Sequence, residues 1–469
     1  MLIRHAEVSG TRPLDVRVVD GVITAIAPAL DAESGERVLY AAGGALLPGL
    51  HDHHLHLFAL ARAADSVSCG PPDVSTVAQL EDALVRSSAA DVGSDPWIRG
   101  IAYHESVAGD LDRDRLDVWL PERPARVQHR SGALWILNSA GLAAIGVRAE
   151  SETPPGVERD AAGRPTGRLF RLDAWLRERM GSSPLPDLTA VGRRLAEFGV
   201  TGLTDATVSN GNTELAALVD AVNRRALPQR LVVMGTRELG VPDHPDIERG
   251  AVKIVLAETE LPTFDELVAE IASAHAAERP VAIHCVARSE LILAAGALAA
   301  ALVHPGDRIE HAAVAPPESL ELVKSLSVTV VTQPNFVRER GDAYRVDVTP
   351  RDRSWLYRCR AFLEAGIPVG GGTDAPFGDP DPWAAMRAAV DRRTLGGAEL
   401  GRDERITPEQ ALALFTTTAQ APGGAVRRVA AGERADLCLL DRPWADARET
   451  LDASHVIATF RDGVSIGAS

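Results

Sequence analysis

Apolar and polar residues alternate near both ends of the chain. Two such runs, 14–19 and 22–26, flank Asp20–Gly21, and another pair lies at 435–440 and 455–460. Alternation predicts half-buried strands, and Asp-Gly between two runs is typical of a hairpin. We therefore predict a small β-sandwich domain built from both chain ends, residues 1–44 and 425–469.

Between these ends, short apolar runs recur, and most are followed by a helical stretch. The predicted strands are Ala45–His56, Thr201–Asp205, Leu231–Met234, Val252–Leu256, Val281–His284, Arg308–His311, Val328–Thr332 and Pro368–Asp374. Eight alternating units are typical of an α/β fold, the (β/α)₈ TIM-like barrel. We assign the barrel to residues 45–424. The stretch of about 69–186 is too long for one connection, so we expect an insertion there.

Composition narrows the function classes. The chain has 469 residues, 45% of them hydrophobic and 24% charged, which is typical of a globular protein. Its net charge of −16 lacks the basic footprint of a nucleic-acid binder, so we expect no nucleic-acid partner. The apolar run 291–303 is shorter than the roughly 20 residues of a membrane span, and the first residues show no signal pattern. Four scattered cysteines favour a reducing cytoplasm.

The sharpest chemical motif is Pro-Gly-Leu-His-Asp-His-His-Leu-His at 48–56. On a strand, residues two apart share a face, so His54 and His56 point one way with Asp52, and His51 and His53 point the other. Two imidazoles two residues apart at a strand end form half of a metal site. A solvated histidine-rich turn is the alternative.

Three further residues end apolar strands of the predicted barrel. His284 closes the run 281–284 and His311 closes 308–311, whereas Asp374 follows a glycine run. The carboxyl ends of barrel strands face the mouth where active sites lie. An aspartate there can ligate a metal and carry a proton. The alternatives are core histidines bonded to backbone carbonyls and a helix-capping or turn aspartate.

Lys253 stands inside the apolar run 250–256 and is one of only two lysines, with Lys324, among 49 basic residues. Burial lowers the pKa of an ammonium group and frees the amine to react. A carbamate formed with CO₂ would carry a carboxylate able to bridge two metals. The alternative is a lysine paired with a carboxylate near the barrel mouth.

Taken in order, these motifs resemble the amidohydrolase superfamily of metal-dependent hydrolases. Within it, the chain most resembles the N-substituted formamide deformylase and exoenzyme-regulatory-like branch. The motifs that carry the resemblance are 48–56, Val-Lys-Ile at 252–254, Ile-His at 283–284, Ile-Glu-His at 309–311, Gln-Pro at 333–334 and Gly-Gly-Thr-Asp-Ala-Pro at 371–376. The resemblance spans nearly the whole chain.

This resemblance implies a set of metal ligands and one or two divalent ions, zinc foremost and other transition metals as the alternative. The implied ligands are His54, His56, His284, His311 and Asp374, with Lys253 as a carboxylated bridge. The chain departs from the branch in two pocket-shaping loops. The loop after Leu256 is short, and Cys285–Arg288 follow His284 where the branch has Gly-Asp.

We therefore expect hydrolysis of a C–N bond in an amide, formamide or cyclic amide. A metal-activated hydroxide would attack, with Asp374 as the proton shuttle. Ester, lactone or deaminase-type hydrolysis at the same site is an alternative, as is a non-catalytic barrel used for binding. The expected partner is a small-molecule substrate, and a homodimer is left open. Candidate substrate-binding residues are Tyr103, His129, Arg288, Gln333 and Asn335, and His104 and Glu105 lie beside Tyr103.

Overall fold

A computed structural model describes residues 1–10, 13–71, 73–89, 97–181, 184–258 and 260–467. The chain divides into two compact units, Met1–Leu57 with Asp187–Ser469, and Phe58–Pro186. The second unit contains the stretch predicted as an insertion. The domain boundaries at 44/45 and 424/425 stay a prediction.

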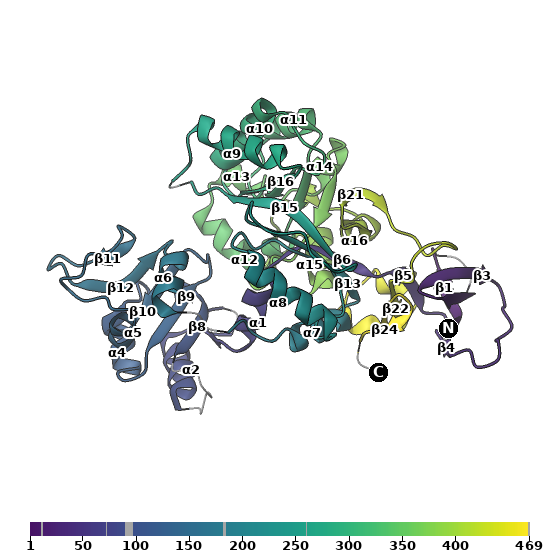
Figure 1. The fold of residues 1–469 in the computed structure, drawn as a ribbon, viewed down its shortest axis with the longest axis horizontal. Coiled ribbons are helices and arrows are strands. Elements are labelled where there is room, and N and C mark those ends of the chain that lie inside the picture. Colours follow the sequence, from purple (N-terminus) through teal and green to yellow (C-terminus); the bar gives the residue numbers. More distant parts are fainter. Residues whose placement is uncertain (11–12, 72, 90–96, 182–183, 259, 468–469) are drawn as a thin grey trace. The chain divides into compact units, whose positions relative to one another are not determined.

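The first unit contains a barrel of parallel strands (Figure 1). In the order of their hydrogen-bonded neighbours, the eight described strands are β6 (Leu50–Leu55), β13 (Val200–Asp205), β14 (Arg230–Gly235), β15 (Ile247–Val255), β16 (Val281–Cys285), β17 (Arg308–His311), β18 (Thr329–Thr332) and β19 (Val369–Gly371). Beyond the last strand, the Asp374 amide donates to the His54 carbonyl at 2.7 Å. The His56 amide donates to the Ala375 carbonyl at 2.8 Å, so the ring is nearly closed.

Helices connect the strands and lie outside the barrel. Within the sequence of this unit the described helices are α7 (Thr189–Glu197), α8 (Asn212–Asn223), α9 (Phe264–Ala276), α10 (Arg288–Ala301), α11 (Pro317–Leu326), α12 (Asn335–Asp347), α13 (Pro350–Arg353), α14 (Arg360–Glu364), α15 (Pro382–Asp391), η1 (Arg402–Glu404), α16 (Pro408–Thr416), α17 (Trp444–Ala447) and η2 (Ala453–His455). Helix α9 begins directly after Thr263, because Thr263 and Glu266 form a reciprocal capping box.

A separate sheet combines the two chain ends, and both termini lie beside it in Figure 1. Its strands are β1 (Leu2–Val8), β2 (Leu14–Val19), β3 (Val22–Ala27), β4 (Val38–Tyr40), β5 (Ala45–Pro48), β22 (Leu437–Leu440), β23 (Val456–Arg461) and β24 (Val464–Ser465). A short pair, β20 (Thr417–Thr418) and β21 (Ala421–Val426), precedes its C-terminal part. Apolar side chains from both ends share one core, including Ile3, Val16 and Phe460. The predicted fold class is confirmed.

The first predicted barrel strand needs a correction. Residues 45–56 form two strands, because the chain leaves the terminal sheet at Gly49 and enters the barrel as β6. Strand β5 pairs with β1 and β22, whereas β6 pairs with β13. A Cβ atom on Gly49 would lie 2.3 Å from Cγ2 of Thr201, so only glycine allows this close approach.

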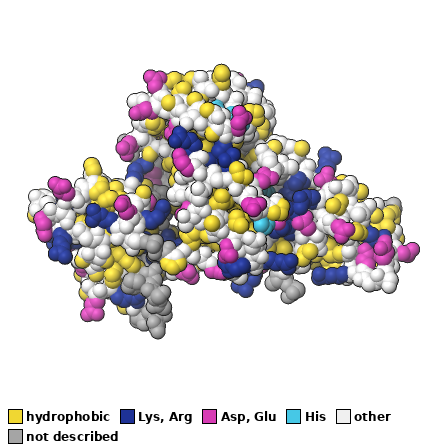
Figure 2. All heavy atoms as spheres, in the orientation of Figure 1, with side chains coloured by type: hydrophobic (Ala, Val, Ile, Leu, Met, Phe, Trp, Pro, Cys, Tyr) yellow, Lys and Arg dark blue, Asp and Glu magenta, His cyan; other side chains and the backbone are white. Residues whose placement is uncertain are grey.

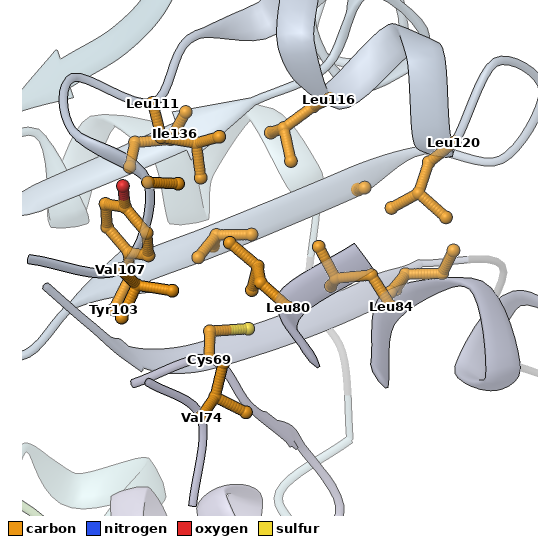
Figure 3. Close-up of a cluster of buried hydrophobic side chains, with 14 of the residues drawn as sticks. Cys69, Val74, Leu80, Leu84, Tyr103, Val107, Leu111, Leu116, Leu120 and Ile136 are labelled. Atoms are coloured by element: carbon orange, nitrogen blue, oxygen red, sulfur yellow. The ribbon is translucent and has the colours of Figure 1, made fainter. Parts of the chain in front are cut away.

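The second unit has its own sheet and core. Its strands are β7 (Val67–Ser68), β8 (Ile98–Tyr103), β9 (Ala125–His129), β10 (Leu134–Leu137), β11 (Val157–Arg159) and β12 (Pro165–Phe170). Its described helices are α2 (Val77–Ala89), α3 (Glu105–Ala108), α4 (Arg113–Trp119), α5 (Ser139–Ala144) and α6 (Asp173–Met180), and α1 (Leu57–Ala64) leads into it. Leu80, Leu84, Leu116 and Ile136 point toward one another in Figure 3 and are buried.

Helix length and surface charge bear on the kinds of partner expected from the sequence. None of the helices in the described ranges is long and apolar enough to cross a membrane. On the face that Figure 2 shows, acidic and basic side chains are interspersed.

Candidate metal centre

The barrel brings four histidines and one aspartate together at the carboxyl ends of its strands. His54 and His56 come from β6 and the residue after it, His284 from β16, His311 from the end of β17, and Asp374 from the turn after β19. The His311 ring centroid lies 4.8 Å from that of His54 and 4.5 Å from that of His284. One oxygen of Asp374 lies 3.1 Å from His56 Nε2 and 3.5 Å from His54 Nε2. The structure thus assembles five of the six ligands that the resemblance implies.

The second ring nitrogen of three of these histidines has a partner of its own. His54 Nδ1 bonds to the Glu310 carboxylate, His311 Nδ1 lies 2.6 Å from Gln333 Oε1, and His56 Nδ1 lies 3.0 Å from Thr207 Oγ1. Such partners fix the ring orientation and the tautomer, which leaves Nε2 as the ligand atom. The donor chemistry therefore fits a divalent metal at this place.

Sequence reasoning missed Glu310 as part of the site. Its side chain is fully buried, and it bonds to Arg308 as well as to His54. Arg308 also donates to the His53 carbonyl at 2.8 Å. Although burial alone would raise the pKa of Glu310, the Arg308 charge and its neighbours hold that pKa well below its usual range. The available signal in the sequence was the pair of opposite charges, Arg308 and Glu310, two residues apart on a predicted buried strand.

Burial also sets the charge states of the ligand residues. Burial and then the nearby Lys253 charge lower the pKa of His54 to about 3. Burial likewise lowers the pKa of His284 and of His311, so all three imidazoles are neutral at neutral pH. Burial would raise the pKa of Asp374, but the bond from His56 and nearby imidazoles hold it below its usual value. Neutral imidazoles beside an ionised carboxylate are the forms that bind metals.

The backbone at two of these residues is unusual. His311 and Asp374 have φ values of +67° and +57°, which non-glycine residues rarely adopt. Such conformations concentrate at functional sites, where the surrounding structure holds them in place. Here His311 is the last residue of β17, and Asp374 lies in the turn after β19.

Lys253 lies on β15 and is 5% exposed. Its Nζ has no hydrogen-bond partner among the described residues. Burial lowers the pKa of Lys253 to about 8, although the carboxylate of Glu310 acts in the opposite direction. A buried amine without a partner is the environment in which a lysine becomes reactive.

The other residues of the histidine-rich motif have structural contacts. Asp52 accepts hydrogen bonds from the backbone amides of His54 and Thr373, each at 3.1 Å, and so ties β6 to the turn that carries Asp374. His51 Nε2 lies 2.9 Å from Thr204 Oγ1, and His53 Nε2 lies 3.0 Å from Thr417 Oγ1. The predicted division of the motif into two faces is therefore observed.

The barrel candidates for substrate binding already have partners. Gln333 holds His311, as described above, and Asn335 Nδ2 donates to the Thr373 carbonyl at 3.0 Å. Arg288 pairs with Asp352 and lies 5.3 Å from the Trp355 ring centroid, so its charge is already compensated. Through these contacts Gln333 positions the His311 ring, and Asn335 holds the backbone next to Asp374.

The two remaining candidates belong to the insertion. Tyr103 is 2% exposed, packs in the core shown in Figure 3, and donates its hydroxyl to the Gly109 carbonyl at 2.7 Å. This is a core position, and a contact of Tyr103 with a substrate stays a prediction. His129 lies at the end of β9, where its Nε2 is 3.0 Å from a Glu105 oxygen.

A (β/α)₈ barrel that brings imidazoles and a carboxylate together at its strand ends is typical of metal-dependent barrel hydrolases. The family model described as "Amidohydrolase family", Amidohydro_3, matches residues 37–466. The chain belongs to this amidohydrolase family.

Known proteins similar to this chain agree with that assignment. It is 28% identical to the N-substituted formamide deformylase of Arthrobacter pascens, over 97% of this chain and 93% of that protein. An uncharacterized metal-dependent hydrolase of Pyrococcus horikoshii OT3 has a TM-score of 0.72 at 20% identity, over 94% and 98% of the two chains. Atrazine chlorohydrolase TrzN of Arthrobacter aurescens TC1, complexed with zinc, has a TM-score of 0.56 at 14% identity, over 99% and 95%. At these identities the two solved structures support the fold alone.

Proposed function

We propose that this protein is a metal-dependent hydrolase that cleaves the C–N bond of an amide, formamide or cyclic amide. The observation that carries the proposal is the convergence of His54, His56 and His311 on Asp374 at the strand ends of the barrel, with the His284 ring packed against that of His311. The similarity to a formamide deformylase across 97% of the chain supports the C–N bond as the target.

We assign the metal ligands to His54, His56, His284, His311 and Asp374. Imidazole and carboxylate donors suit zinc among the divalent metals, and zinc is bound in the structurally similar TrzN. A divalent ion held by these residues lowers the pKa of water toward about 7 and polarises a carbonyl oxygen.

Asp374 moves the proton in this proposal. Its carboxylate is ionised; one oxygen lies 3.1 Å from His56 Nε2, and the other can accept the proton of the attacking water. The same oxygen returns that proton to the leaving nitrogen, which departs as a neutral amine. His56 and His54 hold the carboxylate in place, and Gln333 and Glu310 hold His311 and His54.

Lys253 is the proposed bridge between two ions. Its neutral amine adds to CO₂, a C–N bond forms, and one proton leaves to solvent, which gives a carbamate anion. The lowered pKa of about 8 enlarges the neutral fraction of the amine that this addition needs. The carbamate would also place a carboxylate, which can bind cations, on the Nζ atom that has no hydrogen-bond partner among the described residues.

The same proposal includes a small-molecule substrate, no nucleic-acid partner, and a cytoplasmic location. All four cysteines are free and buried, which suits a reducing compartment. The net charge of −16 disfavours polyanionic partners.

A substrate panel tests the proposed function. The zinc-loaded full chain is incubated with an N-alkylformamide, a primary amide, a cyclic imide and an alkyl ester, and the released amine, formate or acid is measured. We expect release from at least one C–N substrate, loss of that activity after chelation, and recovery on adding Zn²⁺. Asp403→Asn, which removes an exposed carboxylate, is the matched control for Asp374→Asn and keeps the activity. Cleavage of the ester alone, or of nothing, would contradict the proposal.

A further inference from the structure

The insertion contains a second cluster of side chains of the metal-binding type. His104, Glu105 and His129 each offer one ligand atom, and these three atoms lie within 4.8 Å of one another. His129 Nε2 is 3.0 Å from Glu105 Oε2, and His104 Nε2 is 3.5 Å from Glu105 Oε1. Both imidazoles are largely buried, whereas the Glu105 side chain is 60% exposed.

The fold of the insertion brings His129 next to Glu105, which lies 24 positions earlier in the chain. Strands β8 and β9 are parallel neighbours, and Tyr103 pairs with His129 in their register. His104 and His129 therefore leave the carboxyl ends of adjacent strands, which is where sheets of this kind bind ligands. The buried ring of Tyr103 anchors the end of β8 in the core.

Each imidazole is oriented by a serine two residues further along the chain. His104 Nδ1 lies 2.8 Å from Ser106 Oγ, and His129 Nδ1 lies 2.8 Å from Ser131 Oγ. The backbone amides of the same serines also donate to these nitrogens, at 3.3 and 3.1 Å. This His-x-Ser arrangement occurs twice, and both times it directs Nε2 toward Glu105. In histidines that bind metals through Nε2, Nδ1 carries the ring proton and donates it, and the two serine hydroxyls are placed to accept such a proton.

We propose that His104, Glu105 and His129 form a second divalent-metal site, suited to Zn²⁺, within the insertion. Tetrahedral zinc with bonds of about 2.0–2.1 Å requires ligand atoms about 3.3 Å apart, and each imidazole has one Glu105 oxygen near that distance, Oε1 at 3.5 Å from His104 and Oε2 at 3.0 Å from His129. Three protein ligands leave a fourth position for water or another small ligand, on the side where Glu105 is exposed. This inference does not depend on the proposed function of the barrel.

Binding requires a change of tautomer at both histidines. Without metal, each Nδ1 accepts from a serine amide, so the ring proton is on Nε2 and is directed at the Glu105 carboxylate. With metal on Nε2, the ring proton moves to Nδ1 and is donated to the serine hydroxyl. The two amide bonds are lost in this exchange, and we therefore expect micromolar affinity.

Zinc stoichiometry tests the proposal on the full chain. Wild type, Glu105→Gln, His129→Asn and Asp110→Asn are brought to equilibrium by dialysis against saturating Zn²⁺, and bound zinc per chain is measured by elemental analysis as the excess over the dialysis buffer. Asp110 is an exposed carboxylate of the same insertion and provides the matched control. We expect the Glu105 and His129 variants to bind one zinc fewer than wild type and Asp110→Asn. Equal stoichiometry in all four proteins would overturn the proposal.

The tautomer gives a readout that nonspecific zinc binding would not change. In ¹⁵N-histidine NMR spectra, zinc should convert two more imidazoles to the Nδ1–H form in wild type than in Glu105→Gln, because the barrel histidines respond equally in both proteins. Circular dichroism of the variants checks that the insertion remains folded. Retention of both Nε2–H signals at zinc saturation would overturn the site even if the stoichiometry differed.

Discussion

At the scale of single residues, the candidate metal centre depends on what lies behind each ligand. His54 is backed by Glu310, His311 by Gln333 and His56 by Thr207. These partners determine which nitrogen is presented, so the site can be weakened without changing a ligand. Substitution of a ligand, of a ligand's partner and of Lys253 should therefore have different effects on metal binding and turnover.

Asp374→Asn should lower turnover by about 10²–10⁴-fold while the protein retains some of its metal. The amide can still offer an oxygen to a metal but cannot accept the proton of the attacking water. Steady-state kinetics with the best substrate of the panel, together with elemental analysis, measure both effects. Turnover close to wild type would show that the proton is carried by another group.

Glu310→Gln should weaken metal binding by about 10–100-fold, because His54 loses its negatively charged partner. The variant also leaves Arg308 buried without a charge partner, so a loss of stability is expected as well. Glu404→Gln is the matched control, since Glu404 is a buried carboxylate that pairs with Arg358 at 2.7 Å. Competition titrations with a chelator measure affinity. Equal weakening in both variants would indicate a general effect of stability.

Lys253→Ala should lower both metal content and activity, and added acetate or propionate should partly restore them. The short acid would occupy the space of the missing carbamate and supply its carboxylate. Mass spectrometry of the native wild-type protein should show the added mass of CO₂. An unmodified Lys253 ammonium paired with a carboxylate away from any metal would contradict this role.

At the scale of elements, the apolar runs located the barrel strands well. Strand β16 ends within one residue of its predicted end, because its first three residues are all apolar, as expected of a strand buried on both faces. The break at Gly49 was not predictable, since it depends on Thr201 approaching from another strand. Glu310 was overlooked for a similar reason, because its partner His54 reaches it only in the closed barrel.

Helix α15 provides a pH-dependent test of an element. Asp381 caps it by accepting from the Trp383 amide at 2.8 Å, and burial raises the pKa of Asp381 from 3.8 to about 6. The folded state therefore holds this proton more tightly than the unfolded chain, and the free energy of unfolding falls as pH rises from 4 to 6. The loss amounts to about 3 kcal/mol at most.

Asp381→Asn keeps a capping side chain but does not titrate. Relative to wild type, its melting temperature should rise by a few degrees between pH 4 and pH 7. Thermal melts of the metal-free proteins at both pH values measure this difference. A constant difference would show that Asp381 has an ordinary pKa.

At the scale of the whole molecule, the sequence predicted a barrel, a sheet from both ends and an insertion, since each has its own apolar periodicity. Asp374 and the four histidines of the candidate metal centre followed from the rule that barrel sites lie at strand ends. The contacts of Tyr103 and Arg288 did not follow, because a tyrosine or arginine near a strand end packs or pairs according to neighbours distant in sequence. The substrate pocket therefore remains the least predictable part.

The presence of a metal among the barrel ligands is the central claim, and anomalous X-ray diffraction tests it most directly. Crystals of the zinc-loaded protein are measured on both sides of the zinc absorption edge. We predict an anomalous peak in contact with Asp374 and with imidazole nitrogens from the set His54, His56, His284 and His311, at bond lengths of about 2.0–2.2 Å. An edge-specific map with no peak among these residues at full zinc loading would contradict the account.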